Sequence, residues 1–431
     1  MLCVLIDGKH AGDIEFHRRR ATLRYKPEYI RDSAVPLSSR FPLAGLEASG
    51  PELRNWLLNL LPDDESVLNH LRSEFGVDRR DPLRLLETPM GADCAGAVQF
   101  CGPEDVADLL ASKGGEHPIT NDEIAEWLRD YPVLPASMDG TRRDLHVGFS
   151  LAGMQPKIAL RSVADGTWTR PWGSLPTTHI IKAARIEYPD ECIFEHIAME
   201  TAARLGIPAA TTTVTEVDNL QVIVVTRFDR FDGGALRIHQ EDTCQTLGVP
   251  PAEKYERCSG PGITELRQLA SSAGGSAASR NVDRLRDMLI YHWLIANNDA
   301  HAKNYSWLFA PDGSPELSPL YDACSWLPYR GNRQVQRIPL AMKMGEGFNL
   351  KTCDKEAGLV GLAEKLRRSR SEICERVIEF ANGLPAAMDA TVDRLPGIAV
   401  NPQRIESHVE ELRGRAQKCE RLAQTTLRAR P

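Results

Sequence analysis

The stretch IYHWLIANNDAHAKNYSWLFAPDGSPELSPLYD, residues 290–322, decides how the rest of this chain is interpreted. Its apolar start, residues 290–295, is typical of the end of a buried helix. The asparagines at 297 and 298 favour a turn directly after that helix. Residues 305–309 and 317–320 have the composition of two short strands, separated by a Pro-Asp-Gly turn. The stretch therefore predicts a helix end, a polar loop and a hairpin in succession.

Three side chains of this stretch, Asp299, Asn304 and Asp322, are expected to meet in one place. A carboxylate can accept the proton of an attacking hydroxyl, and an amide with a second carboxylate can hold magnesium, which prefers oxygen ligands. Protein kinases use the spacing Asp-x-x-x-x-Asn in their catalytic loop, and Asp299 and Asn304 have that spacing. Taken alone the pattern is also compatible with a polar surface loop followed by a hairpin.

Length and composition predict an ordinary multidomain globular protein. The 431 residues suggest two or three domains, and 42% hydrophobic residues are enough for a sizeable core. A formal net charge of −7 argues that the chain as a whole does not bind polyanions, so any nucleic-acid contact must come from a local patch or a partner. We find no signal peptide and no apolar run of the roughly 20 residues that span a membrane. We therefore expect a cytoplasmic protein without a membrane contact.

The ten cysteines are scattered along the chain and never form a Cys-x-x-Cys motif. Cys94 and Cys101 are too far apart for a zinc knuckle. This spacing argues against a zinc site and against a redox pair, and it fits a chain whose thiols stay reduced.

The first 140 residues are expected to form a mixed α+β subdomain. Residues 2–6, 11–16 and 21–25 resemble a meander of short strands. Residues 51–75 have helical spacing, interrupted where Pro62 ends the first helix. A glycine-punctuated strand is expected at 91–100, and short helices at 105–112 and 120–131, the second starting with a Thr120–Glu123 capping box.

Residues 141–230 have the order of a kinase small lobe. A loop at 150–157 lies between two strand patterns, and the next strand, 177–182, ends in Lys182. The helix predicted over 193–205 carries Glu195. In a kinase, a strand lysine binds the α- and β-phosphates and pairs with a glutamate of the following helix. Two further strands lead to a hinge around Thr226.

The remainder, residues 231–431, is predicted to be a mostly helical large lobe. Two helices are expected within 260–296, joined by a glycine- and serine-rich loop at 271–279. Further helices are predicted at 356–366, 371–384, 386–395 and 404–427.

Several motifs together resemble the HipA family, the kinase toxins of bacterial toxin–antitoxin modules. The similarity covers nearly the whole chain, and its most diagnostic part is the Asp-x-His-x-Lys-Asn run. The motifs are SLAGMQPK (150–157), TTHIIK (177–182), RFDR (227–230), QEDTCQTLG (240–248), NDAHAKN (298–304) and YD (321–322). The resemblance implies an α+β, bilobal, protein-kinase-like fold with an extra N-terminal subdomain and ATP-dependent serine/threonine phosphorylation.

The resemblance also implies roles for individual residues. Asp299 would be the catalytic base, Asn304 and Asp322 would hold Mg²⁺, and Lys182, paired with Glu195, would contact the phosphates of ATP. The implied nucleotide-binding set is Ala152, Gly153, Met154, Gln155, Pro156, Lys157, Lys182, Thr226, Arg227, Phe228, His301, Ala302, Lys303, Asn304, Tyr321 and Asp322. Within this set, Thr226, Arg227 and Phe228 would offer hinge backbone groups to adenine, although Met154, Pro156 and Thr226 depart from residues found in some members.

Regulation and partners are likewise implied by the resemblance. Ser150 falls where family members carry an autophosphorylated serine, and a phosphate there would disfavour the ATP-bound position of the loop. Family members are bound by a small helix-turn-helix antitoxin (HipB-like) that represses the operon, and they phosphorylate translation components such as aminoacyl-tRNA synthetases. Contact with operator DNA would then come mainly through the antitoxin.

A basic run, Lys365, Arg367, Arg368 and Arg370, stands out in an acidic chain. It fits a solvated turn between helices, or a patch that contacts DNA phosphates when the antitoxin holds the complex on its operator. Two alternatives to a protein kinase toxin stay open: a kinase of a small molecule or lipid, and a non-catalytic corepressor partner of the antitoxin.

Overall fold

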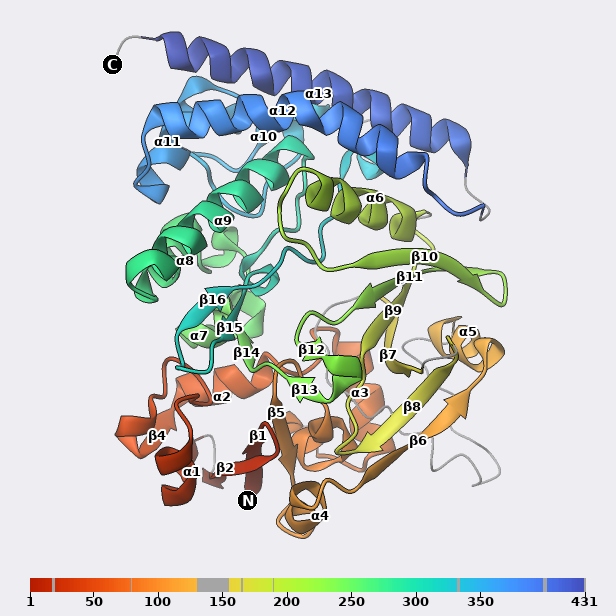
Figure 1. The fold of residues 1–431 in the computed structure, drawn as a ribbon, viewed down its shortest axis with the longest axis vertical. Coiled ribbons are helices and arrows are strands. Elements are labelled where there is room, and N and C mark those ends of the chain that lie inside the picture. The colour runs from red at the N-terminus through yellow and green to blue at the C-terminus, as the bar shows by residue number, and fades with distance from the viewer. Residues whose placement is uncertain are drawn as a thin grey trace. The chain divides into compact units, whose positions relative to one another are not determined.

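The computed structural model describes residues 1–17, 20–78, 80–129, 155–163, 166–188, 190–331, 334–397 and 401–429 (Figure 1). The chain forms two compact units. The first comprises Met1–Ala183, Val217–Ala252 and Ser306–Pro315, and the second comprises Ala184–Glu216, Glu253–Tyr305 and Glu316–Pro431. Most strands belong to the first unit and most long helices to the second. The predicted division into segments 1–140, 141–230 and 231–431 stays a prediction.

An antiparallel five-stranded sheet opens the first unit and confirms the predicted meander. The strands follow the order β4-β3-β2-β1-β5, with bounds β1 (Leu2–Ile6), β2 (Lys9–His17), β3 (Arg20–Tyr25), β4 (Glu47–Gly50) and β5 (Val98–Cys101). Alternate residues of β1 enter different clusters: Leu2, Val4 and Ile6 join the main core, whereas Cys3 and Leu5 join a smaller one. The strand predicted over 91–100 is wrong in its first part, because Pro89–Ala92 forms a 3-10 turn.

Short helices pack on the sheets of the first unit. They are α1 (Pro27–Asp32), α2 (Pro51–Leu58), α3 (Glu65–Glu74), α4 (Val106–Leu110) and α5 (Asn121–Arg129), of which α5 belongs to the core of the second sheet, described next. The predicted break between α2 and α3 contains Pro62, but α2 already ends at Leu58, earlier than predicted. The Asp64 side chain caps α3 by accepting from the backbone N–H of Ser66 and Val67. The predicted capping box of α5 is confirmed, because the Glu123 carboxylate accepts from the Thr120 backbone and Thr120 Oγ1 accepts from Glu123 N–H.

A second antiparallel sheet in the first unit carries the predicted lysine strand. Its strands follow the order β11-β9-β7-β8-β6, with bounds β6 (Gly114–Ile119), β7 (Lys157–Ser162), β8 (Trp168–Gly173), β9 (His179–Ala183) and β11 (Leu220–Thr226). Sequence analysis missed β6 and β8, because glycines and prolines such as Pro118 and Pro171 lie inside them and hide the strand pattern. β10 (Thr212–Val217) falls almost wholly within the second unit.

The remaining short elements of the first unit explain one motif that sequence analysis quoted without a role. The QEDTCQTLG motif forms β14 (Gln240–Asp242) and α7 (Thr243–Leu247), and β14 pairs with β15 (Ser306–Phe309). The buried carboxylate of Glu241 accepts from Trp56 Nε1 (2.9 Å) and Ser39 Oγ (2.7 Å). The motif therefore ties α2 to this small sheet. The other short strands are β12 (Arg230–Phe231), β13 (Leu236–Arg237) and β16 (Pro315–Leu317). Of these, β16 has its first residue in the first unit and the other two in the second.

Long helices dominate the second unit (Figure 1). They are α6 (Glu191–Arg204), α8 (Ile263–Ser272), α9 (Gly275–Leu294), α11 (Glu356–Leu366), α12 (Arg370–Val392) and α13 (Pro402–Arg428), with the single turn α10 (Leu350–Cys353) before α11. The helix predicted over 356–366 is confirmed. The loop predicted over 271–279 is wrong, since α9 already begins at Gly275.

The two helices predicted on either side of Pro385 form one helix, α12. Proline removes one backbone hydrogen bond and usually ends or kinks a helix. Here Ala381, Leu384 and Met388 around it are buried, and α12 runs along α13. Tertiary packing on this face offsets the local preference of the proline. No helix within the described part of the chain is long and apolar enough to cross a membrane.

Candidate active site

The catalytic loop, residues 297–304, begins where α9 ends. The last turn of α9 is fully buried, and Ala296, with φ +54°, turns the chain out of the helix. The buried side chain of Asn297 then fixes the loop: its Oδ1 accepts from Asp299 N–H (2.9 Å), and its Nδ2 contacts Nδ1 of His292 (3.0 Å). The turn predicted at the two asparagines is confirmed, and it delivers Asp299 at a defined point.

Asp299 and Asn304 are held together as their spacing predicted. Asn304 Nδ2 donates to the Asp299 backbone carbonyl (2.9 Å), and His301 N–H donates to the same oxygen (2.8 Å). Asn304 is buried whereas Asp299 is exposed. The Tyr255 hydroxyl donates to the Asp299 carboxylate. The loop thus presents a carboxylate to solvent on a backbone that buried amide groups fix.

His301 lies at the centre of the charged side chains of this loop. Burial lowers the pKa of His301 to about 4, with smaller opposing effects from Asp299 and Asp322 and further lowering from Lys254 and Lys303. Its ring is therefore neutral near pH 7. It packs edge-on against the Tyr255 ring, with centroids 5.0 Å apart, and its buried Nδ1 has no hydrogen-bond partner among the described residues.

Asp322 reaches the loop from the chain that follows β16. The Leu320 backbone is anchored on both sides, by N–H to Pro208 carbonyl (2.8 Å) and by its own carbonyl to Ala210 N–H (2.8 Å). The Tyr321 hydroxyl donates to the Lys303 carbonyl (2.6 Å). Asp322 itself has φ +57° and is exposed. A left-handed non-glycine residue costs of order 1 kcal/mol and commonly marks a functional site.

These residues fit a magnesium ion and a phosphate group. With its amide nitrogen engaged by Asp299, Asn304 has its amide oxygen left for a cation, and the exposed Asp322 carboxylate would offer a second hard oxygen ligand. The unpartnered Nδ1 of buried His301 is a polar atom whose desolvation a bound group would offset.

The lysine strand of the first unit gathers positive charge. Lys182 in β9 lies directly opposite Lys157 in β7, so both side chains stand on one face of the sheet. Gln155 Nε2 donates to the Ala183 carbonyl (3.0 Å), and Ala183 N–H donates to the Pro156 carbonyl (3.0 Å). The structure thus holds the described end of the predicted phosphate-covering loop, Gln155 and Pro156, against the end of the lysine strand at Ala183. Four predicted site residues, Ser150, Ala152, Gly153 and Met154, lie outside the described residues.

Lys182 and Glu195 are both buried, at 7% and 3% exposed. They belong to different units, Lys182 to the first and Glu195, in α6, to the second. Their ion pair therefore stays a prediction.

Arg227 does not fit the role predicted for it at the hinge. Its backbone N–H donates to the Thr178 carbonyl (3.0 Å), so this donor is not available to adenine. Its guanidinium is buried and bonds Asp229 Oδ1 (3.0 Å) and the Thr177 hydroxyl (2.9 Å). We call the set to which it belongs the buried charge cluster: Asp93, Arg227, Asp229, Arg230 and Arg237. Thr226 is exposed at the end of β11, and Phe228 is half-buried.

The predicted basic run is largely engaged within the chain. Lys365 Nζ donates to the Lys343 carbonyl (2.6 Å), Arg368 to Asp283 (2.8 Å) and Arg370 to the Ala429 carbonyl (2.6 Å). A DNA phosphate would have to compete with these bonds. Contact with DNA through Lys365, Arg367, Arg368 and Arg370 stays a prediction, and these bonds weaken it.

Sequence analysis missed the residues that support the loop from outside the motif. Tyr255 and Lys254 approach His301 from a segment with no recognisable pattern, and the Lys254 carbonyl accepts from Ala302 N–H (3.1 Å). Asn297 precedes the motif by one residue, so its side-chain role could have been inferred from its preference for turns.

Comparison with known proteins agrees with this geometry. Residues 149–387 match the model of the HipA-like C-terminal domain, which is more than half of the chain, and residues 2–101 match that of the HipA N-terminal domain. The Y4mE protein of Sinorhizobium fredii is 32% identical, covering 94% of this chain and 93% of its own. The serine/threonine-protein kinase toxin HipA of Shewanella oneidensis is 29% identical, covering 92% and 90%.

A solved structure shares the whole fold. A chain of the Shewanella oneidensis MR-1 complex of HipA, HipB and operator DNA superposes with a TM-score of 0.82 at 25% identity, covering 100% of both chains. The predicted α+β, HipA-like kinase fold is thereby confirmed. The family model and the full-length relatives together show that this chain belongs to the HipA family of serine/threonine protein kinases.

Proposed function

We propose that this kinase uses ATP and Mg²⁺ to phosphorylate serine or threonine hydroxyls of a protein, with Asp299 as the catalytic base. The observation that carries the proposal is the construction of the catalytic loop. The Asp299 carboxylate is exposed, and the Asp299 backbone carbonyl accepts a hydrogen bond from Asn304 Nδ2. The amide oxygen of Asn304 is left for a metal. That combination suits an attacking hydroxyl beside a metal-bound phosphate.

In the proposed step, the Asp299 carboxylate takes the proton of the substrate hydroxyl. The hydroxyl oxygen bonds to the γ-phosphorus, the bond from that phosphorus to the β–γ bridging oxygen breaks, and ADP leaves. Asn304 and Asp322 would hold Mg²⁺, and the bound ion would neutralise charge on the phosphate oxygens. Tyr255 keeps the carboxylate oriented through its hydroxyl.

The remaining predicted residues would hold the nucleotide. We assign phosphate contacts to Lys182 and Lys157, whose opposed positions concentrate positive charge, and to neutral His301. The lysine would be oriented by Glu195. The rest of the proposed nucleotide set is Ala152, Gly153, Met154, Gln155, Pro156, Thr226, Phe228, Ala302, Lys303 and Tyr321.

We further propose that the chain is the toxin of a toxin–antitoxin module. This rests on two comparisons. The Shewanella oneidensis relative is named a serine/threonine-protein kinase toxin, and the matching solved structure is a complex of HipA, HipB and operator DNA from that organism. By that analogy a HipB-like helix-turn-helix antitoxin binds the chain in the cytoplasm and contacts operator DNA. The phosphorylated protein would be a translation component, with an aminoacyl-tRNA synthetase as the leading candidate.

The direct test is phosphoproteomics after expression of the native chain and of Asp299→Ala. We expect new phosphoserine or phosphothreonine on a translation protein with the native chain and none with the variant. Label that appears instead on a small metabolite would favour a small-molecule or lipid kinase. Operator binding with antitoxin but no phosphoryl transfer by purified native chain would favour a corepressor.

Self-inactivation at Ser150 has its own test. Ser150→Ala should abolish most labelling of the chain by γ-labelled ATP while transfer to other proteins continues for longer. A phosphate mapped to another residue of the native chain would exclude this role for Ser150.

A further inference from the structure

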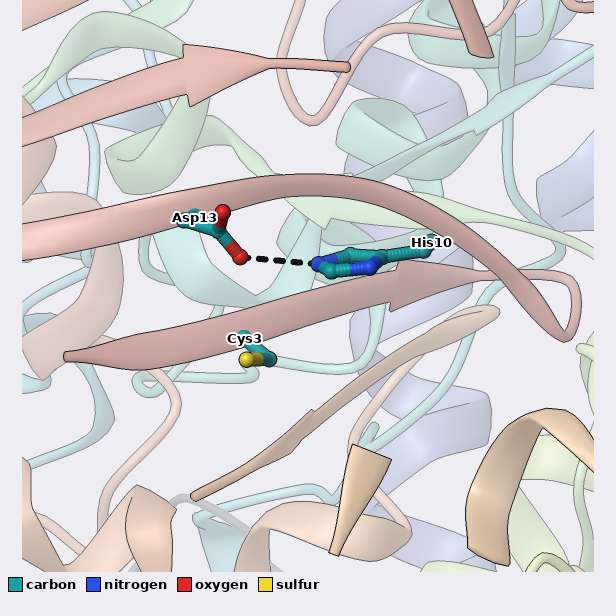
Figure 2. A group of neighbouring side chains, drawn as sticks. All are labelled: Cys3, His10 and Asp13. Atoms are coloured by element: carbon teal, nitrogen blue, oxygen red, sulfur yellow. Dashed lines mark hydrogen bonds and ion pairs between the residues drawn. The ribbon is translucent and has the colours of Figure 1, made fainter. Parts of the chain in front are cut away.

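A cluster of metal-type side chains lies in the N-terminal sheet, in neither the catalytic loop nor the lysine strand. Cys3 of β1 and His10 and Asp13 of β2 bring one thiol, one imidazole nitrogen and one carboxylate oxygen within 4.8 Å of one another (Figure 2). His10 Nε2 and Asp13 Oδ1 are 2.8 Å apart. Thiolate, imidazole and carboxylate are the ligands that Zn²⁺ takes in proteins.

An irregularity in the strand pairing creates this cluster. Val4 faces Gly12 and Leu5 faces His10, so Ala11 is an extra residue without a partner on β1. Residues three apart in a regular strand point to opposite faces. The bulge at Ala11 shifts the alternation, so His10 and Asp13 point to the same face as Cys3. Ala11 itself points into the main core.

A fourth donor stands on the other side of Cys3. Cys101 of β5 is the direct cross-strand neighbour of Cys3, so the two side chains stand on the same face of the sheet. Both thiols are free and buried. β1 and β2 thus supply one sulfur, one nitrogen and one oxygen within 4.8 Å of one another, and β5 adds a second sulfur beside Cys3 that lies outside this group.

The surroundings complete a site for a cation. Lys26 Nζ donates to Asp13 Oδ2 (2.6 Å) and orients the carboxylate from behind, while a bound metal would replace the contact between Asp13 Oδ1 and His10 Nε2 (2.8 Å) by one bond to each atom. The side chains of His10 and Asp13 are 23% and 21% exposed, so an ion can enter from solvent. With two thiolates and one carboxylate, a divalent ion leaves one negative charge, which the Lys26 ammonium offsets.

We propose that Cys3, His10 and Asp13 form a Zn²⁺ site between β1 and β2, and that the Cys101 side chain of β5 turns toward the ion as the fourth ligand. Two sulfurs and an imidazole favour zinc over magnesium, which prefers oxygen ligands. Binding replaces the two thiol protons, which pass to solvent, by two Zn–S bonds, and no oxidant or reductant is needed. The site revises the expectation, based on the spacing of the cysteines, that the chain has no zinc site.

The test titrates the full-length, tag-free, metal-stripped chain with Zn²⁺ and with Co²⁺. We expect one ion per chain, a thiolate-to-cobalt charge-transfer band and a higher thermal midpoint with Zn²⁺. Cys3→Ser and His10→Gln should each weaken binding by more than about 100-fold, and Lys26→Met by about tenfold, as loss of an outer partner does.

Matched controls separate this site from adventitious binding. Cys258→Ser removes an exposed thiol of the second unit, and His17→Gln removes an exposed histidine of the same strand β2. Both should bind zinc like the native chain. The proposal is overturned if the native chain binds no stoichiometric zinc, if the controls lose it equally, or if mass spectrometry shows a Cys3–Cys101 disulfide in the metal-stripped chain under reducing buffer. The native titration decides even if a ligand variant fails to fold.

Discussion

The buried charge cluster of the first unit and the catalytic loop of the second unit use charged residues in opposite ways. In the cluster, every carboxylate is buried against guanidinium groups, as when Arg230 bonds Asp93 (2.9 Å) and Asp229 (3.0 Å). In the loop, amide groups are buried and the carboxylate of Asp299 is exposed, as is that of Asp322 after β16. The charged groups of the cluster are paired with one another and stabilise the fold. The exposed carboxylate of Asp299 is instead held in place by the neutral side chains of Tyr255, Asn297 and Asn304.

The largest effect should follow from removing a carboxylate of the loop. Asp322→Asn should lower phosphoryl transfer by at least about 10³-fold, because the variant lacks the charge of the proposed metal ligand, which would stabilise the transferring phosphate. Transfer of label from γ-labelled ATP to a protein acceptor measures it. Asp312→Asn, in the exposed turn between β15 and β16, is the matched control and should retain native activity. Equal loss in both variants would contradict a specific role.

Breaking the buried charge cluster should destabilise the fold instead. Arg227→Met leaves the buried Asp93 and Asp229 without one of their guanidinium partners, which should lower the free energy of unfolding by about 3–5 kcal/mol. Urea denaturation measures the change. The exposed pair of Arg80 and Asp78 provides the control, and Arg80→Met should leave the urea midpoint unchanged. An unchanged midpoint in Arg227→Met would mean that the cluster adds nothing to the fold.

Acidification should weaken both units through buried neutral histidines. Burial lowers the pKa of His239 and of His301 to about 4, while the unfolded chain binds a proton near pH 6.5. The free energy of unfolding is therefore unaffected by these histidines above pH 6.5, and it falls by roughly 3 kcal/mol for each as the pH drops toward 4, because only the unfolded chain takes up the protons. Urea midpoints between pH 7 and 4 measure it. His239→Gln should flatten the pH dependence, and the exposed His17→Gln should not; equal curves for the two variants would contradict this assignment.

The smallest effect should come from the support of the catalytic carboxylate. Tyr255→Phe deletes the hydroxyl that donates to Asp299, and kcat should fall about tenfold, because a hydrogen bond to a charged group contributes about 1.5–3 kcal/mol. KM for ATP should stay unchanged. Tyr29→Phe deletes a hydroxyl of the first unit that donates to the Val35 carbonyl (2.7 Å), and it should keep native kcat. A kcat loss in Tyr29→Phe as large as in Tyr255→Phe would point to general destabilisation.

Local patterns predicted the catalytic loop well, because its side chains act through short spacings. The distance of five residues between Asp299 and Asn304 was enough to foresee that the two lie together, whereas the hydrogen bond by which Asn304 anchors the Asp299 backbone was not foreseen. The helix break that contains Pro62 and the turn at Asn297 were foreseen for the same reason, since both depend on neighbouring residues, although α2 and α9 end a few residues earlier, at Leu58 and Leu294.

Properties that depend on distant residues were not predictable in this way. Arg227 looked like a hinge residue, but Asp93, from a segment far along the sequence, draws its guanidinium into the cluster. The continuity of α12 through Pro385 depends on packing against α13. Cys3 and Cys101 looked isolated until β1 and β5 paired. Sequence spacing carries no signal for such contacts.

The central claim is that Asp299 takes part in chemistry and not in stability. The most direct measurement compares Asp299→Ala with the native chain in three assays: label transfer from γ-labelled ATP to protein, affinity for Mg²⁺–ATP and urea midpoint. We expect transfer to fall to background while affinity and midpoint stay within experimental error of the native values. Residual transfer near the native rate, or a loss of transfer that tracks a lower midpoint, would contradict the claim.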